Sequence, residues 1–384
     1  MTIEYIDKPE QLTELCDRIR QASWIALDTE FLREKTYYPI FCLLQIATPE
    51  WVVCVDPIAL ADEEMTELFE VIQNPDIIKV LHSCRQDLEI FFQLTGQLTA
   101  PVFDTQIAAP LLGFQENPGY AMLVSNLLNV NLAKTHTRTD WTVRPLSEEQ
   151  IKYAADDVIY LCKVYQMMIQ KLEELGRLDW LDKDFELLKN PELYQLSPVN
   201  AWKKVKGKNR LTGKQLSIIQ GLSQWREQTA QAENRPKNWL IRDDLLLELA
   251  KLQPETVNEL GNVRSINERT VKRYGKIICQ IIAEYKEQPP LAMDAKKVNK
   301  KSQKQEAIVD ILTALVRLRS DENSLNPTIL ANRKDLEGLV LGDNDSPVLQ
   351  GWRYSMVGKE LQGFLQGEFT LTLDSDEIVL ADRV

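Results

Sequence analysis

Three short clusters in the first half of the chain carry side chains that could bind a hard cation. The first is Asp28-Thr29-Glu30, the second contains Asp87, and the third is Tyr153 with Asp157. Divalent ions such as Mg²⁺ and Mn²⁺ prefer oxygen ligands. The four carboxylates therefore indicate a site for Mg²⁺ or Mn²⁺, and their order along the chain is more informative than any single residue.

The residues before the first cluster predict a strand that brings both of its carboxylates to one face. Trp24-Ile25-Ala26-Leu27 is apolar and leads directly into Asp28. Because alternate side chains of a strand share a face, Asp28 and Glu30 point the same way and repel each other unless a cation lies between them. Taken alone, the pair could equally consist of solvated acids at the end of a strand.

The third cluster falls on a long predicted helix. Ser147, followed three residues later by Gln150, matches a capping box. Residues four apart lie on one face of a helix, so Tyr153 and Asp157 project together. This spacing favours Asp157 over Asp156 as a ligand, although an ordinary amphipathic helix with a half-buried tyrosine would also explain it.

Asp87 is expected in the first turn of a helix over 85–94. The helix dipole alone would explain an acid there. The joint occurrence of the three clusters, in this order, is what favours a metal site. Strands interleaved with helices, including a hairpin of 42–47 with 51–55, predict an α/β domain with a mixed sheet.

Charge is distributed unevenly along the 384 residues, whose formal net charge is −12. Residues 1–192 hold 16 Lys and Arg against 32 Asp and Glu, whereas residues 193–384 hold 29 against 25. An acidic half that needs cations and a mildly basic half that meets phosphate would account for this asymmetry. Simple variation of surface charge would account for it too.

Composition excludes several other classes of protein. No apolar run approaches the roughly 20 residues that span a bilayer, and the amino terminus lacks the pattern of a secretory signal. The six cysteines include no Cys-x-x-Cys pair, which opposes a zinc module or a disulfide framework. We expect a cytoplasmic protein without a membrane partner, and we predict no protein partner.

The three clusters resemble the exonuclease motifs of the DEDD superfamily, in its tyrosine-bearing branch. The similarity is greatest to the ribonuclease D family and covers most of residues 1–175. It extends over the segments 28–39, 43–47, 103–108, 139–146 and 153–158. The resemblance implies an α/β exonuclease domain with a ribonuclease H-like mixed sheet flanked by helices.

This resemblance implies a two-metal mechanism. Asp28, Glu30 and Asp157 would hold one divalent cation, Asp28 and Asp87 would reach the second, and Tyr153 would orient the attacking water. The implied activity is a hydrolytic 3′-to-5′ exoribonuclease that releases nucleoside 5′-monophosphates. Its implied substrates are RNAs with a free 3′ end, such as tRNA precursors and other small structured RNAs.

Other residues are interpreted more modestly. His82 precedes Asp87 with the spacing of the superfamily's histidine branch, but the later Tyr153 motif leaves it a structural role. Asp104 is expected to cap a helix. Candidates for contact with RNA, through base stacking or phosphate binding, are Tyr37, Tyr38, Trp141, Arg144, Lys203, Lys204, Lys206 and Arg226. At least one of the aromatic residues is expected to lie in the core instead.

The second half resembles two small all-α modules. Residues 211–288 are similar to an HRDC domain, through Trp225-Arg226, Asn234-Arg235-Pro236 and Arg273-Tyr274-Gly275. Residues 306–384 resemble a second, divergent HRDC-like domain, whose alternating tail at 369–373 reads as a strand. The expected domains are the exonuclease domain 1–195, a basic linker 196–210, the HRDC domain 211–288, a Lys-rich linker 289–305 and the HRDC-like domain 306–384.

Two other functions remain open at this point. The first is a DNA-directed 3′-5′ exonuclease of the same superfamily. A helicase-fused exonuclease is opposed because the sequence contains no G-x-x-x-x-G-K-[ST] motif. The second is a catalytically inactive RNA-binding scaffold, which the complete set of four acids and a tyrosine opposes.

Overall fold

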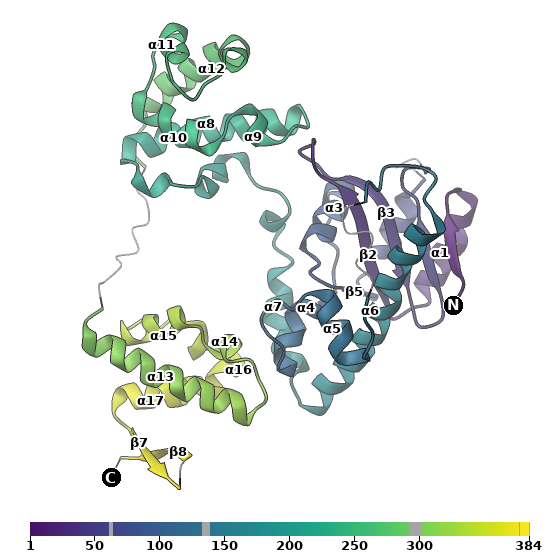
Figure 1. The fold of residues 1–384 in the computed structure, drawn as a ribbon, viewed down its shortest axis with the longest axis vertical. Coiled ribbons are helices and arrows are strands. Elements are labelled where there is room, and N and C mark those ends of the chain that lie inside the picture. The colour runs from purple at the N-terminus through teal and green to yellow at the C-terminus, as the bar shows by residue number, and fades with distance from the viewer. Residues whose placement is uncertain (61–63, 133–138, 292–300, 376, 384) are drawn as a thin grey trace.

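The computed structural model describes residues 1–60, 64–132, 139–291, 301–375 and 377–383. Its amino-terminal part alternates strands and helices (Figure 1). The elements are β1 (Ile3–Ile6), α1 (Glu10–Arg20), β2 (Trp24–Leu32), β3 (Ile40–Ala47), β4 (Val52–Val55), α2 (Thr66–Ile72), β5 (Ile78–Leu81), α3 (Arg85–Thr95), β6 (Val102–Asp104), α4 (Thr105–Ala108), η1 (Ala109–Leu112), α5 (Tyr120–Leu128) and α6 (Glu148–Glu174).

Six strands form one mixed sheet in the order β1-β4-β3-β2-β5-β6. The β2–β3 and β3–β4 pairs are antiparallel and the other pairs are parallel, so the predicted mixed sheet and hairpin are confirmed. Alternate residues of β2 enter two different cores. Ala26 faces the core beneath α6, whereas Ile25 and Leu27 face the core shared with α1, α2 and α3.

The long helix α6 forms as its capping residues predict. Ser147 Oγ accepts a hydrogen bond from the Gln150 backbone N–H at 3.2 Å, and Gln150 Oε1 accepts one from the Ser147 N–H at 2.8 Å. The buried stripe of the helix packs on β2, β3 and β4. Its length carries the helix across the sheet (Figure 1).

The chain then passes through η2 (Leu178–Leu181), α7 (Asp182–Leu187) and η3 (Pro191–Leu193). The stretch 196–210, which the sequence suggests as a basic linker, is instead largely folded. It contains η4 (Pro198–Lys204) and η5 (Lys208–Arg210), and η4 packs on the first helix of the next domain. Ala201 and Val205 are buried there while the intervening lysines remain exposed. The buried Ala201 and Val205 anchor this segment.

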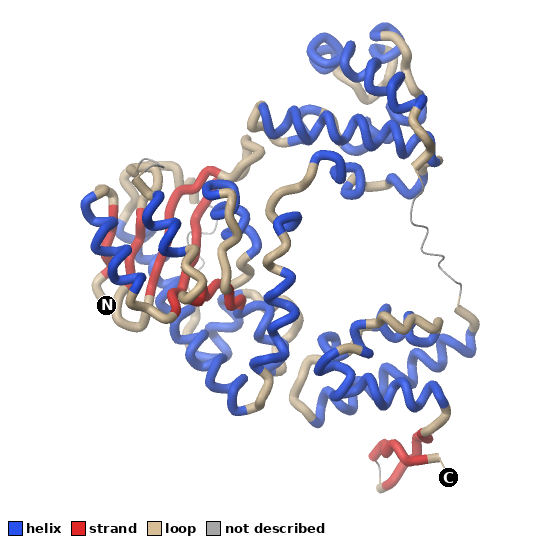
Figure 2. Tube along the Cα trace, turned by 180° about the vertical axis from the view of Figure 1, so that it is seen from behind, coloured by secondary structure: helices blue, strands red, loops and turns tan. Residues whose placement is uncertain are grey.

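Two helical domains follow. The first consists of α8 (Gly213–Ala232), α9 (Lys237–Leu240), α10 (Asp243–Leu252), α11 (Val257–Gly261) and α12 (Glu268–Glu287). The second consists of α13 (Gln303–Glu322), α14 (Pro327–Leu330), α15 (Arg333–Val340), η6 (Pro347–Leu349), α16 (Gly351–Arg353), the π-helical η7 (Tyr354–Gly358) and α17 (Lys359–Gln366). Both lie beside the exonuclease domain in Figures 1 and 2.

The second helical domain differs from the sequence expectation at both ends. Its first helix starts before 306, because Ser302 caps it with Gln305 and Lys301 pairs with Glu306 and Glu337. The lysines at 296, 297 and 300 lie outside the described residues. The predicted strand at the tail is β7 (Phe369–Asp374), and it pairs with a strand that the sequence did not suggest, β8 (Glu377–Asp382). None of the helices described is long and apolar enough to span a membrane.

Candidate active site

Strand β2 delivers Asp28 and Glu30 to the face that α6 covers. In the antiparallel ladder Asp28 lies opposite Gln45 and Glu30 lies opposite Leu43. The ladder is irregular immediately after Glu30, where the register shifts. Such a bulge bends a strand and redirects its side chains. Both carboxylates are partly exposed, so the strand presents them at the edge of the core.

Asp87 reaches the site from the first turn of α3, as the sequence predicts. Its carboxylate is buried and accepts a hydrogen bond from the Thr29 hydroxyl. Thr29 stands between Asp28 and Glu30, so its side chain leaves β2 on the opposite face. This threonine was not singled out from the sequence, although its place between two acids was a signal. It fastens α3 to the strand that carries Asp28 and Glu30.

Helix α6 supplies the remaining two residues. Tyr153 and Asp157 lie one turn apart, and the Tyr153 ring lies 6.3 Å from the ring of Trp141, centroid to centroid. Tyr120, from α5, donates its hydroxyl hydrogen bond to the backbone carbonyl of Asp157. The tyrosine of α5 was also not foreseen. It holds the turn of α6 on which Asp157 sits.

The pKa shifts show that these acids lie within electrostatic reach of one another. Burial and then Asp157 raise the pKa of Asp28 to about 8. Burial, followed by Asp28, Asp157 and Asp87, raises the pKa of Glu30 to about 9. Burial raises the pKa of Asp157 to about 7, and burial together with Asp28 raises that of Asp87. The structure therefore brings together acids that are distant in sequence.

Tyr153 belongs to the same electrostatic group. Burial and the charges of Asp157, Glu30 and Asp28 raise the pKa of its hydroxyl to about 12. At neutral pH the phenol is therefore protonated and can act as a hydrogen-bond donor. The five residues selected from the sequence as catalytic thus share one neighbourhood of the structure.

The chemistry of these donors suits divalent cations. Four carboxylates, partly or fully buried and mutually repulsive, are stabilised when a cation neutralises them, and hard cations prefer such oxygens. In the described part of the chain, no three acidic, histidine or cysteine side chains already stand in the arrangement of a coordination shell. The argument that these residues suit divalent cations therefore depends on the kind of donor atoms and on their negative charge.

Three residues near the cluster behave as interpreted from the sequence. Asp156 points toward Lys152, 4.0 Å away, on another side of α6. The His82 ring nitrogens lie 2.9 Å from Thr105 Oγ1 and 3.1 Å from the Pro118 carbonyl, as expected of a structural histidine. Asp104 caps α4 by accepting a hydrogen bond from the Gln106 N–H at 2.8 Å.

The candidates for RNA contact are placed in different environments. Trp141 is buried in the core beneath α6. Arg144 binds Asp56, a buried acid at the end of β4, through two hydrogen bonds of 2.6 and 2.7 Å. Arg226 is 2% exposed and donates to the Ile241 carbonyl and to Asp243. All three are therefore committed to packing or to internal partners.

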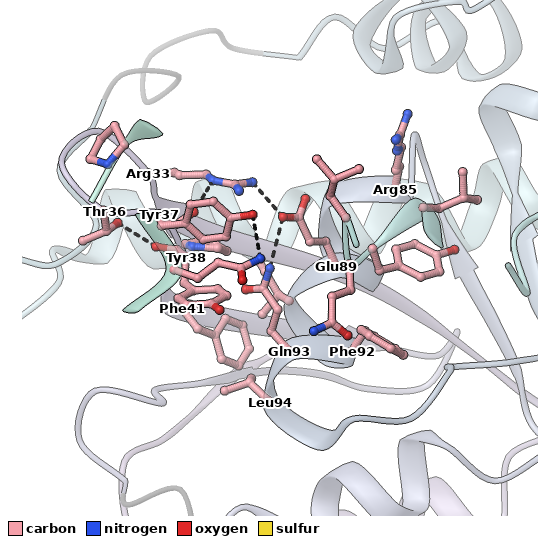
Figure 3. Close-up of a pocket in the computed structure, with 18 of the residues that line it drawn as sticks. Arg33, Thr36, Tyr37, Tyr38, Phe41, Arg85, Glu89, Phe92, Gln93 and Leu94 are labelled. Atoms are coloured by element: carbon pink, nitrogen blue, oxygen red, sulfur yellow. Dashed lines mark hydrogen bonds and ion pairs between the residues drawn. The ribbon is translucent and has the colours of Figure 1, made fainter. Parts of the chain in front are cut away.

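The tyrosine and lysine candidates lie at a surface between domains. Tyr37, Tyr38 and Lys204 line a cleft of about 890 Å³ between the exonuclease domain and the first helical domain. Figure 3 shows Arg33 of this cleft between the backbone carbonyl of Tyr37 and the carboxylate of Glu89. Lys203 within η4 and Lys206 shortly after it are exposed.

Comparison with known proteins agrees with this fold. A family model described as 3′-5′ exonuclease matches residues 3–173, and the HRDC domain model matches residues 215–282. Ribonuclease D of Gluconacetobacter diazotrophicus is 35% identical over 97% of this chain and 95% of its own length. Ribonuclease D of Granulibacter bethesdensis is 34% identical over 98% and 95%.

Solved structures show the same relationship. The crystal structure of Escherichia coli RNase D, described as an exoribonuclease involved in structured RNA processing, matches with a TM-score of 0.80 and 27% identity. The match covers 96% of this chain and 99% of that one. The catalytic core of RRP6 from Trypanosoma brucei matches with a TM-score of 0.57 and 25% identity, over 74% and 79% of the two chains.

The mixed sheet, its acids and the helical domain behind them define a 3′-5′ exonuclease joined to an HRDC domain. Exonucleases of this kind use divalent metal ions. With relatives of about 35% identity along nearly the whole chain, the protein belongs to the ribonuclease D family and is a 3′-to-5′ exoribonuclease.

Proposed function

We propose that this exoribonuclease hydrolyses RNA with two divalent cations, Mg²⁺ or Mn²⁺, and releases nucleoside 5′-monophosphates. Asp28, Glu30 and Asp157 would hold one cation, and Asp28 with Asp87 the other. When bound, the pair would stabilise the attacking and the leaving oxygen of the phosphodiester. The observation that supports this most is the mutual repulsion of four acids gathered from β2, α3 and α6.

The protein's own groups would orient the reaction. With its pKa raised to about 12, the Tyr153 hydroxyl keeps its proton near neutrality. It is therefore suited to hold the attacking water by a hydrogen bond and unsuited to act as a free-standing base. Thr29 fixes the Asp87 carboxylate, and Tyr120 fixes the backbone at Asp157.

The cleft beside the first helical domain is a suitable route for the single-stranded 3′ end. Bases can stack on exposed rings without sequence preference, and lysines supply sequence-independent affinity for phosphate. Tyr38 and Lys204 line this cleft, and Lys203 and Lys206 lie on the same exposed basic segment. Trp141, Arg144 and Arg226 have internal partners and are not part of the proposed route.

The proposed substrates are RNAs with a free 3′ end, in particular tRNA precursors and other small structured RNAs. The support is the similarity to the E. coli enzyme, whose description names structured RNA processing. A stable fold in the RNA would stop the exonuclease where pairing begins, because the strand must enter singly. Trimming of a 3′ trailer requires this stop.

The decisive experiment is digestion of a 3′-extended tRNA precursor by the full chain, with products separated by length. Wild-type protein should shorten the RNA one nucleotide at a time when Mn²⁺ or Mg²⁺ is present and should stop under EDTA. The Asp28→Asn variant should lose activity by at least about a thousandfold, since it removes a ligand shared by both cations. Full activity of Asp28→Asn would refute the proposal.

Asp156→Asn is the matched control, because it removes a neighbouring acid of the same helix that faces Lys152. It should remain within a few-fold of wild type. Two further outcomes separate the rival functions. Faster degradation of single-stranded DNA than of RNA of the same sequence would favour a DNA exonuclease, and binding of RNA without shortening would favour a scaffold.

A further inference from the structure

Gln45 is a buried polar residue without a structural explanation. It lies in the middle of β3 and is 0% exposed. Among the described residues, neither its amide nitrogen nor its amide oxygen has a hydrogen-bond partner. A buried polar group left in this way costs about 1–3 kcal/mol, whereas an apolar side chain of similar shape avoids that cost. Packing of the sheet alone would therefore favour a residue such as methionine.

The position of Gln45 in the sheet connects it to the acid cluster. It lies directly opposite Asp28 of β2 on one side and Cys54 of β4 on the other. Residues directly opposite in an antiparallel pair share a face, with their Cβ atoms about 4.5–5.5 Å apart. The side chain of Gln45 therefore leaves β3 on the same face as that of Asp28 and next to it in the ladder.

The residues around Gln45 offer its amide few other hydrogen-bond partners. Leu43 and Ala47, which share its face of β3, both belong to the core beneath α6. Cys54 has its own contact, 3.9 Å from the Ile151 carbonyl of α6. A thiol is a weak hydrogen-bonding group, so Asp28 is the strong acceptor directly across the ladder from Gln45.

We propose that Gln45 is a positioning residue for Asp28: its amide N–H donates to one oxygen of that carboxylate while the other faces a divalent cation. This inference rests on the proposed function, because it assigns Gln45 a part in holding the same cations. Groups that orient a metal ligand from behind characteristically change metal affinity 10- to 100-fold when they are removed. The unsatisfied amide would then be retained for metal binding, at the expense of the metal-free fold.

The test uses the full chain with Gln45→Met, which keeps the length of the side chain and removes both polar atoms. Calorimetric titration with Mn²⁺ alone, without RNA, measures binding independently of turnover. The thermal unfolding midpoint in EDTA measures the metal-free fold. We expect Mn²⁺ to bind about 10- to 100-fold more weakly, with an unfolding midpoint equal to or above that of wild type. A merely structural glutamine would give the reverse, a lower midpoint with unchanged affinity, and would overturn the inference.

Thr99→Val is the matched control. Thr99 is also buried with an unpartnered hydroxyl among the described residues, but it precedes β6 at the end away from Asp104 and the acid cluster. It should leave Mn²⁺ affinity unchanged. The wild-type titration separates the two hypotheses. Wild-type protein that binds no Mn²⁺ contradicts the proposed function as well, whereas equal binding by wild type and Gln45→Met contradicts the role of Gln45 alone.

Discussion

Two charged clusters lie in the exonuclease domain. One gathers like charges, and the other pairs an acid with complementary partners. The first is the acid cluster of Asp28, Glu30, Asp87 and Asp157. Burial is the largest cause of the raised pKa of each of these acids. The next largest cause is another acid of the cluster for the first three, and the neighbouring Asp156 for Asp157. The second cluster, which we call the Asp56 clamp, consists of Asp56, Arg144 and Tyr5. Its carboxylate is 2% exposed and bound by both neighbours.

Contacts within the Asp56 clamp are short and complementary. Arg144 donates to both oxygens of Asp56, and the Tyr5 hydroxyl donates to Oδ2 at 2.6 Å. Arg144 also donates to the Cys42 carbonyl of β3 at 2.6 Å. Burial by itself would raise the pKa of Asp56, but the hydrogen bonds from Arg144 and Tyr5 outweigh it and lower that pKa.

The contrast separates charges that hold the fold from charges to which we assign the binding of the cations. The Asp56 clamp fastens the loop that carries Trp141 to the sheet, and Trp141 in turn lies against Tyr153. The acid cluster instead makes the metal-free fold less stable, because its members share a buried region with like charges. Each of the following predictions tests one side of this contrast.

The largest effect should come from breaking the Asp56 clamp. Arg144→Met leaves a buried carboxylate without its cation and should lower the free energy of unfolding by about 3 kcal/mol, measured by urea denaturation. Arg333→Met is the matched control, since that arginine pairs with acids while 54% of its side chain is exposed, and it should cost less than about 1 kcal/mol. Equal costs would show that Arg144 is not a structural residue.

The sequence predicted the acid cluster better than the Asp56 clamp, for a physical reason. Asp28, Glu30, Tyr153 and Asp157 depend on local periodicity, two residues in a strand and four in a helix, which a pattern records directly. Arg144 meets Asp56 across 88 residues of chain, and no local spacing reveals such a pair.

Arg226 and the segment 196–210 illustrate the same limit. A positive residue in a basic region suggests phosphate binding. Arg226, however, donates hydrogen bonds to Asp243 and to the Ile241 carbonyl inside the domain. In segment 196–210 the lysines dominate the sequence pattern, so the apolar Ala201 and Val205 were not recognised as buried residues. Their burial holds the segment against the helical domain. Which polar groups are satisfied internally is a property of the tertiary structure, so sequence patterns overestimate the surface available to RNA.

The next effect concerns the acid cluster and its cations. Asp28→Asn should raise the free energy of unfolding of the metal-free protein by about 1–2 kcal/mol at pH 8, because it removes one of four partly or fully buried like charges. Mn²⁺ at about 100 times its dissociation constant should stabilise wild type by about 2.7 kcal/mol and the variant by much less. Calorimetric scans with EDTA and with Mn²⁺ measure both. Loss of stability in the EDTA scan would place Asp28 with the structural charges instead.

The acid cluster also predicts a pH dependence. In the folded protein the pKa values of Asp28, Glu30 and Asp157 are raised to about 8, 9 and 7. The folded state therefore keeps protons that the unfolded state releases near pH 4, and stability falls as pH rises from about 5 to 9. Each retained proton contributes a loss of at most about 1.4 kcal/mol per pH unit. Denaturation in EDTA at pH 6, 7, 8 and 9 should show a steeper decline for wild type than for Asp28→Asn, and parallel declines would count against the cluster.

The smallest effect concerns a buried acid at a third charged site, where the exonuclease domain contacts the first helical domain. Glu227 of α8 is 2% exposed and accepts a hydrogen bond from the Tyr37 hydroxyl at 2.5 Å. The backbone N–H groups of Tyr37 and Tyr38 both donate to Asn234 Oδ1 at 3.0 Å. This acid is therefore bound at one oxygen by a neutral donor from another domain, while Lys237 Nζ of its own domain lies 3.8 Å from its other oxygen.

Tyr37→Phe should weaken the contact by about 1 kcal/mol, because Glu227 loses that donor while the bonds to Asn234 persist. Hydrogen exchange at the amides of residues 37 and 38 measures the opening, and this change should accelerate it about fivefold. Tyr38→Phe, in the same loop, should leave the rate at residue 37 unchanged. If Tyr37→Phe exchanges at the wild-type rate, the neutral hydroxyl contributes nothing to holding Glu227 here, and Lys237 is then its effective partner, as Arg144 is for Asp56.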